Sequence, residues 1–306
     1  MSFAVFVPAL VSVVLALTGP RLAVRASPTV ATWTLSIATG VSAVAFTWSL
    51  GLLAATLIDE VAPSTHEHVA LVAEAAPFTD VVGGISAAIL VAGWLRLIRV
   101  VATSRAAFRK LRAVCAASRS GLGGVAGSRV GLVVLADPVP QAFAAPGDGG
   151  HVIVSTGMLA ALNAPERRVL LAHERAHLRA RHHWHTGVVR AAAAINPMLV
   201  GLPKVSIYLC ERWADESAAT AVGNRRLAAT ALARAALAAS AAPPPRTALG
   251  YHNAGVPARI AALQRAPAPP RTATYLPPLI LVAAAVVADV EATADFLRMI
   301  TRWTGH

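Results

Sequence analysis

The sequence predicts a mainly α-helical membrane protein that carries a cytoplasmic α+β domain. Three observations support this fold class. Of the 306 residues, 56% are hydrophobic and 14% are charged, and the mean hydropathy is +0.60, which excludes a disordered chain and is unusual for a soluble enzyme. The apolar residues collect in blocks long enough to cross a bilayer. The basic residues gather instead in one block, because 23 of the 27 Lys and Arg lie within 96–271.

Four segments are candidate membrane helices, at about 3–20, 30–58, 81–101 and 275–297. The second has 29 residues without a charge, enough to span a bilayer with some tilt. The first could be a signal peptide, but it lacks a basic start, so a membrane helix is the better interpretation. The fourth is interrupted by three acids, and a re-entrant or peripheral helix remains the alternative there.

The charges between these segments predict the orientation. Arg21 and Arg25 lie in the first loop, whereas 59–80 contains five acids and no Lys or Arg. Because basic loops stay inside, the N-terminus is expected outside and the central block in the cytoplasm. The predicted units are 1–102 with three helices, a cytoplasmic domain at 103–271, and 272–306 with the fourth helix and a short outer tail.

The positive charge has a second possible explanation, which is nucleic-acid binding. The apolar flanking spans make the orientation rule the simpler cause, so no direct nucleic-acid contact is expected. The Ala- and Arg-rich, Lys-poor usage suggests a bacterial source, and hence a multi-pass protein of the bacterial cell membrane. Cys115 and Cys210 form no CxxC pair, so neither a disulfide framework nor a cysteine zinc site is expected.

Within the cytoplasmic domain, apolar periodicity, caps and breakers predict the elements. They are a basic helix at 106–118, a Gly-rich joint at 121–127, strands at 130–135 and 151–156, a helix from the Asn163 cap through Trp184, a helix at 204–222, and linkers at 243–245 and 266–278. The apolar stretch 187–203 is short and broken by Asn196-Pro197, so we expect a buried hairpin or a segment that dips into the membrane surface.

The segment Leu170-Leu-Ala-His173-Glu174-Arg-Ala-His177-Leu carries a pattern with a chemical reason. Residues four apart share one face of a helix, so His173 and His177 can bind one Zn²⁺ per chain. Glu174 projects beside the metal and can act as general base toward a water molecule. The competing interpretation is two surface histidines and a solvated glutamate. Five arginines on this helix favour a site in water or at the interface over one inside the bilayer.

Two residues are candidates for a third ligand. His183 has the spacing of a metzincin ligand, but Ala180 replaces the glycine needed for a chain reversal, and the helix pattern continues. With His182 and His185 it otherwise forms a polar cluster at a helix end. Glu211 on the next helix would complete a His₂Glu site with an open position, as catalytic zinc requires. Asp215, one turn later, could hold the outer nitrogen of a ligating histidine.

The chain resembles the membrane zinc peptidases of the BlaR/MecR sensor-transducer type, and more distantly the HtpX type. The resemblance rests on the segment above and on Pro140-Gln-Ala-Phe143-Ala-Ala-Pro-Gly147, Ile153-Val-Ser-Thr156-Gly-Met-Leu, Asn196-Pro197 and Glu211-Arg-Trp-Ala-Asp215. It implies a gluzincin-type domain between the third and fourth membrane helices. It also implies that His173, His177 and Glu211 are the ligands, Glu174 the base and Asp215 the supporting acid.

By the same resemblance, Val152, Ile153, Val154 and Ser155 form an edge strand that pairs with an extended substrate. Sensors of this type carry a penicillin-binding domain after the last helix, which is not seen after Leu297. We therefore expect any signal to arrive through loops, membrane helices or a partner.

Three functions remain open at this point. The first is a regulatory endopeptidase that cuts a cytoplasmic or membrane protein such as a transcriptional repressor. The second is an HtpX-like quality-control protease. The third is a non-catalytic zinc-retaining receptor or scaffold, which an open fourth zinc position disfavours.

Overall fold

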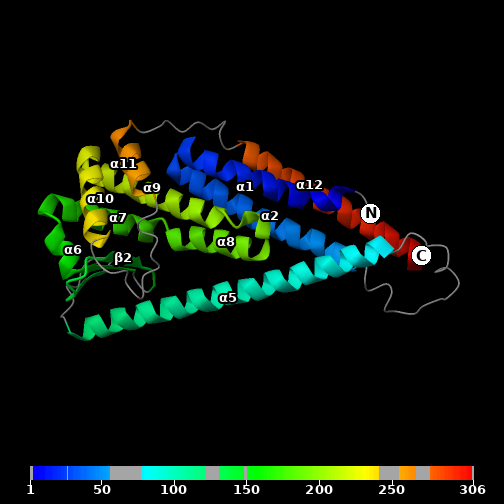
Figure 1. The fold of residues 1–306 in the computed structure, drawn as a ribbon, viewed down its shortest axis with the longest axis horizontal. Coiled ribbons are helices and arrows are strands. Elements are labelled where there is room, and N and C mark those ends of the chain that lie inside the picture. Colours follow the sequence, from blue (N-terminus) through cyan, green and yellow to red (C-terminus); the bar gives the residue numbers. More distant parts are fainter. Residues whose placement is uncertain are drawn as a thin grey trace.

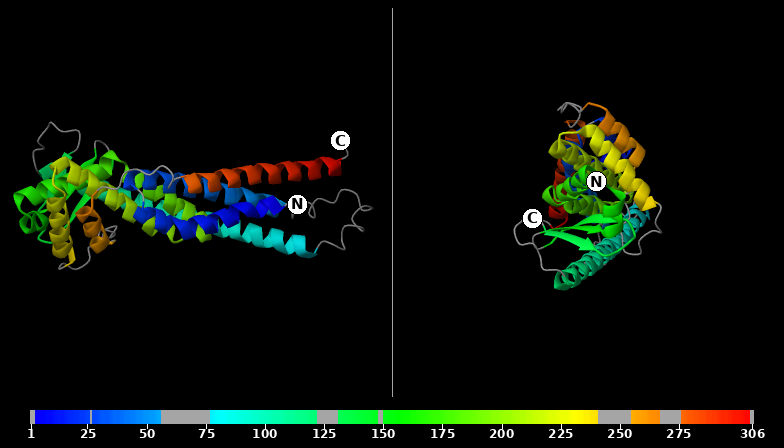
Figure 2. Two further views of the ribbon diagram at one scale, coloured as in Figure 1. Left: turned by 90° about the horizontal axis from the view of Figure 1, so that it is seen from above. Right: turned by 90° about the vertical axis from the view of Figure 1, so that its left-hand side faces the viewer.

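The computed structural model describes residues 3–25, 27–55, 77–121, 131–147, 150–240, 255–266 and 276–304. The molecule is elongated, with long helices at one end and a small sheet with shorter helices at the other (Figure 1). Both termini lie at the end opposite the sheet (Figures 1 and 2). The mainly α-helical class with a small sheet is therefore confirmed.

The long helices are α1 (Val7–Arg25), preceded by the 3-10 turn η1 (Phe3–Phe6), α2 (Pro28–Ala55), α5 (Pro77–Gly121) and α12 (Leu276–Thr304). Among the described residues, three segments are long and apolar enough to cross a membrane: Ala4–Arg21, Pro28–Ala55 and Val81–Ala113. They coincide with the first three predicted spans. Helix α12 forms where the fourth was predicted and packs on α1 and α2, but it is not one of these three, so its crossing stays a prediction.

Several polar side chains inside the bundle find hydrogen-bond partners, as an apolar environment favours. The hydroxyls of Thr32 and Ser36 donate to backbone oxygens one turn earlier in α2. Between elements, the hydroxyls of Ser12 and Ser42 lie 2.7 Å apart, and the amide of Asn196 donates to Ser12 at 2.8 Å. These bonds tie α1 and α2 to the turn that precedes the 3-10 helix η3 (Pro197–Leu199).

Helix α5 is one continuous helix over its 45 residues, about 68 Å at 1.5 Å per residue. It therefore includes both the predicted third span and the predicted basic helix at 106–118, and it runs from the bundle to the sheet (Figure 1). The predicted Gly-rich joint lies largely outside the described residues, as do the linker at 243–245 and most of the one at 266–278.

The sheet has three strands in the order β1-β3-β2. They are β1 (Gly131–Leu135), β2 (Ala142–Ala145) and β3 (His151–Ser155). Strand β3 pairs parallel with β1 and antiparallel with β2. The prediction that Val152, Ile153, Val154 and Ser155 form an edge strand is wrong, because β3 is the central strand and its backbone is paired on both sides.

Burial explains why β3 is central. Val152 and Val154 face a cluster that includes Leu170 and Leu178, whereas Ile153 faces Leu111 of α5 on the other side. A strand covered on both faces is apolar throughout rather than alternating. The free edge beside the helix that carries the two motif histidines belongs to β2, which the sequence did not predict.

The remaining helices surround the sheet or connect it to the bundle. They are α6 (Thr156–Ala161), α7 (Ala164–Arg179), α8 (His182–Ile195), α9 (Leu202–Val222), α10 (Arg225–Ser240) and α11 (Val256–Gln264). The predicted helix through Trp184 is wrong at its end, because the chain breaks at Ala180-Arg181, where Arg181 is left-handed with φ 51°. Helices α8 and α9 form the predicted buried hairpin around Asn196-Pro197, and α9 confirms the predicted helix at 204–222.

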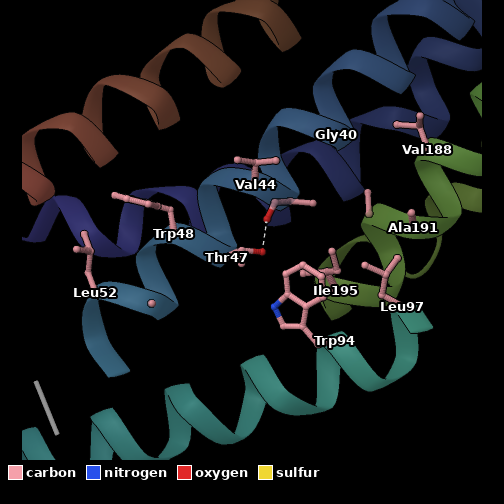
Figure 3. Close-up of a pocket in the computed structure, with 13 residues that line it drawn as sticks. Gly40, Val44, Thr47, Trp48, Leu52, Trp94, Leu97, Val188, Ala191 and Ile195 are labelled. Carbon is pink, nitrogen blue, oxygen red and sulfur yellow. Dashed lines mark hydrogen bonds between the residues drawn. The ribbon is translucent and has the colours of Figure 1, made fainter. Parts of the chain in front are cut away.

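Helix α8 packs between α2 and α5, and an apolar cavity of about 660 Å³ lies among the three helices (Figure 3). Trp94 and Ile195 approach it from α5 and α8. The hydroxyl of Thr47, which also lines it, donates to the carbonyl of Ala43 and is thus satisfied within α2. The surface between α8 and the candidate membrane helices is therefore apolar around this cavity.

Candidate functional site

Helix α7 begins with a complete capping box, which fixes the register of the motif. Asn163 accepts from the backbone of Glu166, and the Glu166 carboxylate accepts from the backbone of Asn163, each at 3.0 Å. Such reciprocal bonds satisfy two otherwise unpaired helix-end donors. Three turns later His173 and His177 lie on one face, with their Nε2 atoms 3.1 Å apart.

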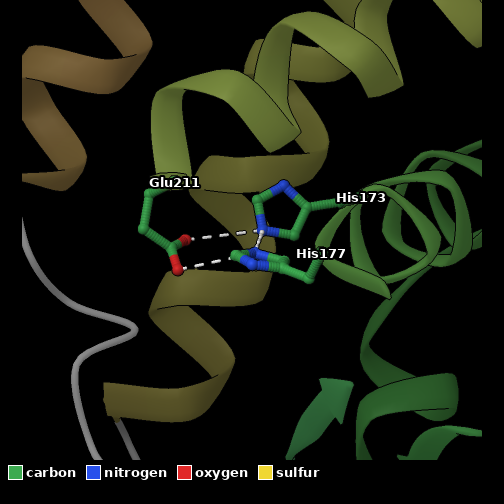
Figure 4. A group of neighbouring side chains, drawn as sticks. All are labelled: His173, His177 and Glu211. Atoms are coloured by element: carbon green, nitrogen blue, oxygen red, sulfur yellow. Dashed lines mark hydrogen bonds and ion pairs between the residues drawn. The ribbon is translucent and has the colours of Figure 1, made fainter. Parts of the chain in front are cut away.

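Glu211 approaches these rings from α9 (Figure 4). Its carboxylate oxygens lie 3.4 Å from Nε2 of His173 and 3.5 Å from Nε2 of His177. A zinc ion about 2.0–2.2 Å from each ligand in tetrahedral geometry would separate its ligands by about 3.3–3.6 Å. The three residues therefore have the donor types and spacings of a metal site, and the structure brings together the three ligands chosen from the sequence.

The outer nitrogen of His173, Nδ1, contacts Asp215, the partner predicted from the sequence. Its Nδ1 lies 3.0 Å from the Asp215 carboxylate, one turn beyond Glu211 on α9. A carboxylate at this position holds the proton on Nδ1 and leaves Nε2 free to bind a cation. Glu174 is buried at 3% exposure and lines the cavity that also contains His173 and Glu211.

Arg259 on α11 is a member of the site that the sequence did not indicate. It is 2% exposed. Its guanidinium donates to both oxygens of Asp215 at 2.7 Å and lies 2.9 Å from the Glu211 carboxylate. Two carboxylates buried side by side need such a partner, because an unpaired buried charge is costly. The only signal in the sequence was a lone arginine in the short apolar segment Pro257-Ala-Arg-Ile-Ala-Ala-Leu263.

The carboxylates favour positive charge at the histidine rings. Burial opposes the charged form of His173, but its hydrogen bonds with Asp215 and Glu211 raise its pKa to about 10. Burial likewise opposes the charged form of Glu211, yet the neighbouring His177, His173 and Arg259 hold its pKa well below the usual range. A group of this kind stabilises a cation at the rings, either a proton or a metal ion.

Of the histidines at the start of α8, His182 rather than His183 lies beside the site. His183 lies against Phe108 of α5, at 6.3 Å between ring centroids, and does not reach the metal-type cluster. The metzincin-like alternative is therefore not supported. His182 is instead buried, and its Nδ1 lies 2.8 Å from Nδ1 of His177. Burial and the neighbouring His177 lower the pKa of His182 to about 2, so its ring is neutral.

A cavity of about 400 Å³ opens on the cluster. Its other walls are the edge strand β2 with the preceding Val139-Pro-Gln141, and the alanine-rich face of α10. Val152, Ile153, Val154 and Ser155 of the central strand do not line it. The cavity can therefore admit an extended chain along β2, with room for an apolar side chain beside α10.

Two imidazoles one helical turn apart, a carboxylate from a second helix and a buried glutamate beside them are the residue types found at the metal centres of zinc peptidases. Residues 122–237 match the family model of peptidase family M48. This part of the chain is therefore similar to the M48 peptidases, which are in general zinc-dependent. The match supports a membrane-type metallopeptidase without distinguishing the BlaR/MecR from the HtpX type. No curated protein and no solved structure matches the chain significantly.

Proposed function

We propose that this protein is an integral-membrane, zinc-dependent endopeptidase of the gluzincin type. The observation that carries the proposal is the convergence of His173, His177 and Glu211, with donor atoms all within 4.8 Å of one another. In this proposal these three residues bind one Zn²⁺, Glu174 is the general base, and Asp215 holds the His173 ring. Arg259 neutralises the two buried carboxylates.

The residues of the chain divide the chemistry between them. A zinc ion bound here would polarise the peptide carbonyl and acidify water. Glu174 takes the proton of the attacking water and passes it to the leaving amine. Asp215 keeps the His173 proton on the outer nitrogen throughout, so that ring stays a ligand.

The shape of the cavity supports a protein substrate bound in extended form. Among the described strands β2 pairs only with β3, so its other edge faces the proposed zinc ligands, which suits strand addition. Ala231, Ala235 and Ala239 of α10 leave space for an apolar side chain opposite that edge. This assignment replaces β3 with β2 as the substrate-pairing strand.

The arrangement of the chain supports the predicted orientation in the bacterial cell membrane. Both termini lie at the end of the molecule opposite the sheet (Figure 1). With the acidic 59–80 segment outside, the zinc domain between α5 and α12 lies in the cytoplasm. The lipid bilayer is then a permanent partner, and α12 is the fourth span. Reporter fusions after residues 75 and 240, active on opposite sides of the membrane, would test this orientation.

In cellular terms we favour regulatory cleavage of a cytoplasmic or membrane protein, such as a transcriptional repressor. Quality control of damaged membrane proteins is the alternative with the same chemistry. The inactive but zinc-loaded Glu174→Gln protein should retain its substrates, which mass spectrometry can identify. Recovery of one DNA-binding regulator would support the first role, and recovery of many misfolded membrane proteins would replace it with the second.

The substitution Glu174→Gln tests catalysis itself. We expect zinc content to be retained and cleavage of labelled casein in proteoliposomes to fall by at least about 10²-fold, because proton transfer is lost. Glu211→Gln should lower both cleavage and zinc content, because it alters a proposed zinc ligand. Glu216→Gln is the matched control, since Glu216 pairs with Arg225 outside the site. Undiminished cleavage by Glu174→Gln would show that Glu174 is not the general base, whereas a wild-type protein that does not cleave would favour the non-catalytic scaffold.

A further inference from the structure

The break between α7 and α8 turns the chain back toward the cluster of His173, His177 and Glu211. Arg181 adopts φ 51° and ψ 43°, so His182, the first residue of α8, turns back toward α7. An uninterrupted helix would have carried His182 onward, five residues from His177 and away from its face. The left-handed residue therefore has a specific result, which is the contact between these two rings.

The contact is close and enclosed. The two Nδ1 atoms are 2.8 Å apart, and the rings stand at 90° with centroids 4.7 Å apart. Trp213 of α9 lies against the other side of His182, at 4.9 Å between centroids. Within the described part of the chain, Nε2 of His182 has no hydrogen-bond partner. The ring thus has one polar contact, and it is with His177.

This geometry assigns the protons. If His177 binds a metal through Nε2, its proton must reside on Nδ1, because a neutral imidazole carries one proton. Nδ1 of His182 must then accept, which places the proton of His182 on its Nε2. A buried N–H without a partner destabilises the fold, so the bond to His177 has to offset that cost.

We propose that His182 positions the metal ligand His177 by accepting the hydrogen bond from its Nδ1, as Asp215 does for His173. The inference rests on the proposed zinc peptidase function. It makes the two ligands unequal, because one is held by a carboxylate and the other by a neutral ring. The neutral acceptor adds no further negative charge to a site that already holds Glu211 and Asp215.

The position of His182 is itself fixed from the membrane side. One turn further along α8, His185 lies 3.0 Å from the hydroxyl of Ser36 and makes an edge contact with Trp33, at 4.5 Å between centroids. Both of these residues belong to α2, a candidate membrane span. His182, which orients His177 in this proposal, therefore belongs to a helix that is held against α2 by the contacts of His185.

Two substitutions separate hydrogen bonding from packing. His182→Phe keeps a ring against Trp213 but removes the acceptor, and zinc affinity of the detergent-solubilised protein should fall about 10–100-fold. His182→Asn loses the ring but places an amide oxygen where Nδ1 stood, and should lose less than about tenfold. The readouts are zinc affinity by chelator competition and the visible absorption spectrum of the Co²⁺-loaded protein, which reports ligand geometry.

Further variants make the outcome decisive. His183→Phe is the matched control, since its ring faces Phe108, and affinity should be unchanged. If His182→Phe does not fold, His182→Gln replaces it, because its oxygen reaches the place of Nε2 rather than Nδ1. Equal affinities and spectra for wild type and His182→Phe, or for the Asn and Gln variants, would overturn the inference. Absence of metal from the wild type, or unchanged metal in His177→Ala, would instead overturn the proposed function.

Discussion

At the scale of single residues, the main feature of the site is that several charged side chains are buried together. Glu211 and Asp215 bring two negative charges to positions that are 6% and 5% exposed. Arg259 contacts both of them and also lies near Glu174. A zinc ion bound as proposed would share Glu211 with Arg259, so each cation should reduce the need for the other.

The substitution Arg259→Met tests this sharing. Removing one partner of a buried ion pair costs about 3–5 kcal/mol, so the metal-free variant should unfold at a lower temperature than the wild type. Added zinc should raise the unfolding temperature of the variant more than that of the wild type, since the ion restores the missing positive charge. Thermal unfolding in detergent with EDTA or zinc measures both effects.

Arg265→Met, at the C-cap that follows the same helix, is the control, because Arg265 is exposed. It should leave both unfolding temperatures unchanged. An Arg259→Met protein as stable as the wild type in EDTA would mean that the carboxylates are compensated by something else.

The sequence predicted those residues whose partners are local. The four-residue spacing of His173 and His177, and of Glu211 and Asp215, places each pair on one helix face. The resemblance to a family then connected the two helices. Arg259 and His182 could not be found in this way, because their roles depend on how α11 and the α7–α8 turn fold back onto the site.

At the scale of elements, the α7–α8 turn is the local structure most sensitive to sequence. A left-handed conformation costs a non-glycine residue roughly 1–2 kcal/mol. Arg181→Gly should remove that strain, at an entropic cost of about 0.5–1 kcal/mol, and leave stability unchanged or slightly higher. The free energy of unfolding in detergent and denaturant is the measurement.

Arg179→Gly provides the comparison two residues earlier. Arg179 is also exposed but lies in the last turn of α7, where glycine should cost about 1 kcal/mol. The two variants should therefore differ in sign or in size. Equal destabilisation by both would mean that the strain at Arg181 is not significant.

There are physical reasons why the sequence did not predict the α7–α8 break and strand β2. The α7–α8 break contains no Gly or Pro, and it forms because His182 and Trp213 pack on the site rather than because Ala180-Arg181 favours a turn. Strand β2 is short and rich in alanine, which has little strand preference. It is a strand because β3 offers it a backbone to pair with. In contrast, the capping box at Asn163 is a local signal and predicted the start of α7 correctly.

At the scale of the whole molecule, close packing of α5 on α8 joins the candidate membrane helices to the helix that follows α7. A Cβ atom at Gly93 would lie 2.9 Å from the backbone oxygen and 3.3 Å from Cα of Ile195. Backbone atoms cannot rotate away, so the two helices would have to separate.

Gly93→Val should therefore lower the free energy of unfolding by about 1–3 kcal/mol, as overpacking does elsewhere. Gly84→Val on the same helix is the control, because a Cβ there meets nothing within 4 Å. Unfolding in lipid nanodiscs measures the difference. If Gly84→Val and Gly93→Val behave alike, the α5–α8 contact does not support the fold.

The apolar spans were predictable because bilayer thickness fixes their length and composition. In contrast, the sequence did not predict how far α8 and α9 of the peptidase part extend into the bundle. Apolar residues of α8 and α9 were compatible with a soluble core, and only the packing partners show that they contact α1 and α2 as well.

This shared core has a practical consequence for anyone who isolates the enzyme. Leu202 and Leu209, on the helix that supplies Glu211, are buried in the same cluster as Leu15 of α1. A truncated fragment covering 122–237 alone would present those leucines to water and would omit Arg259. Inhibitor screens and crystallisation should therefore start from a chain that keeps α1, α2 and α11, because the site helices share their core with them.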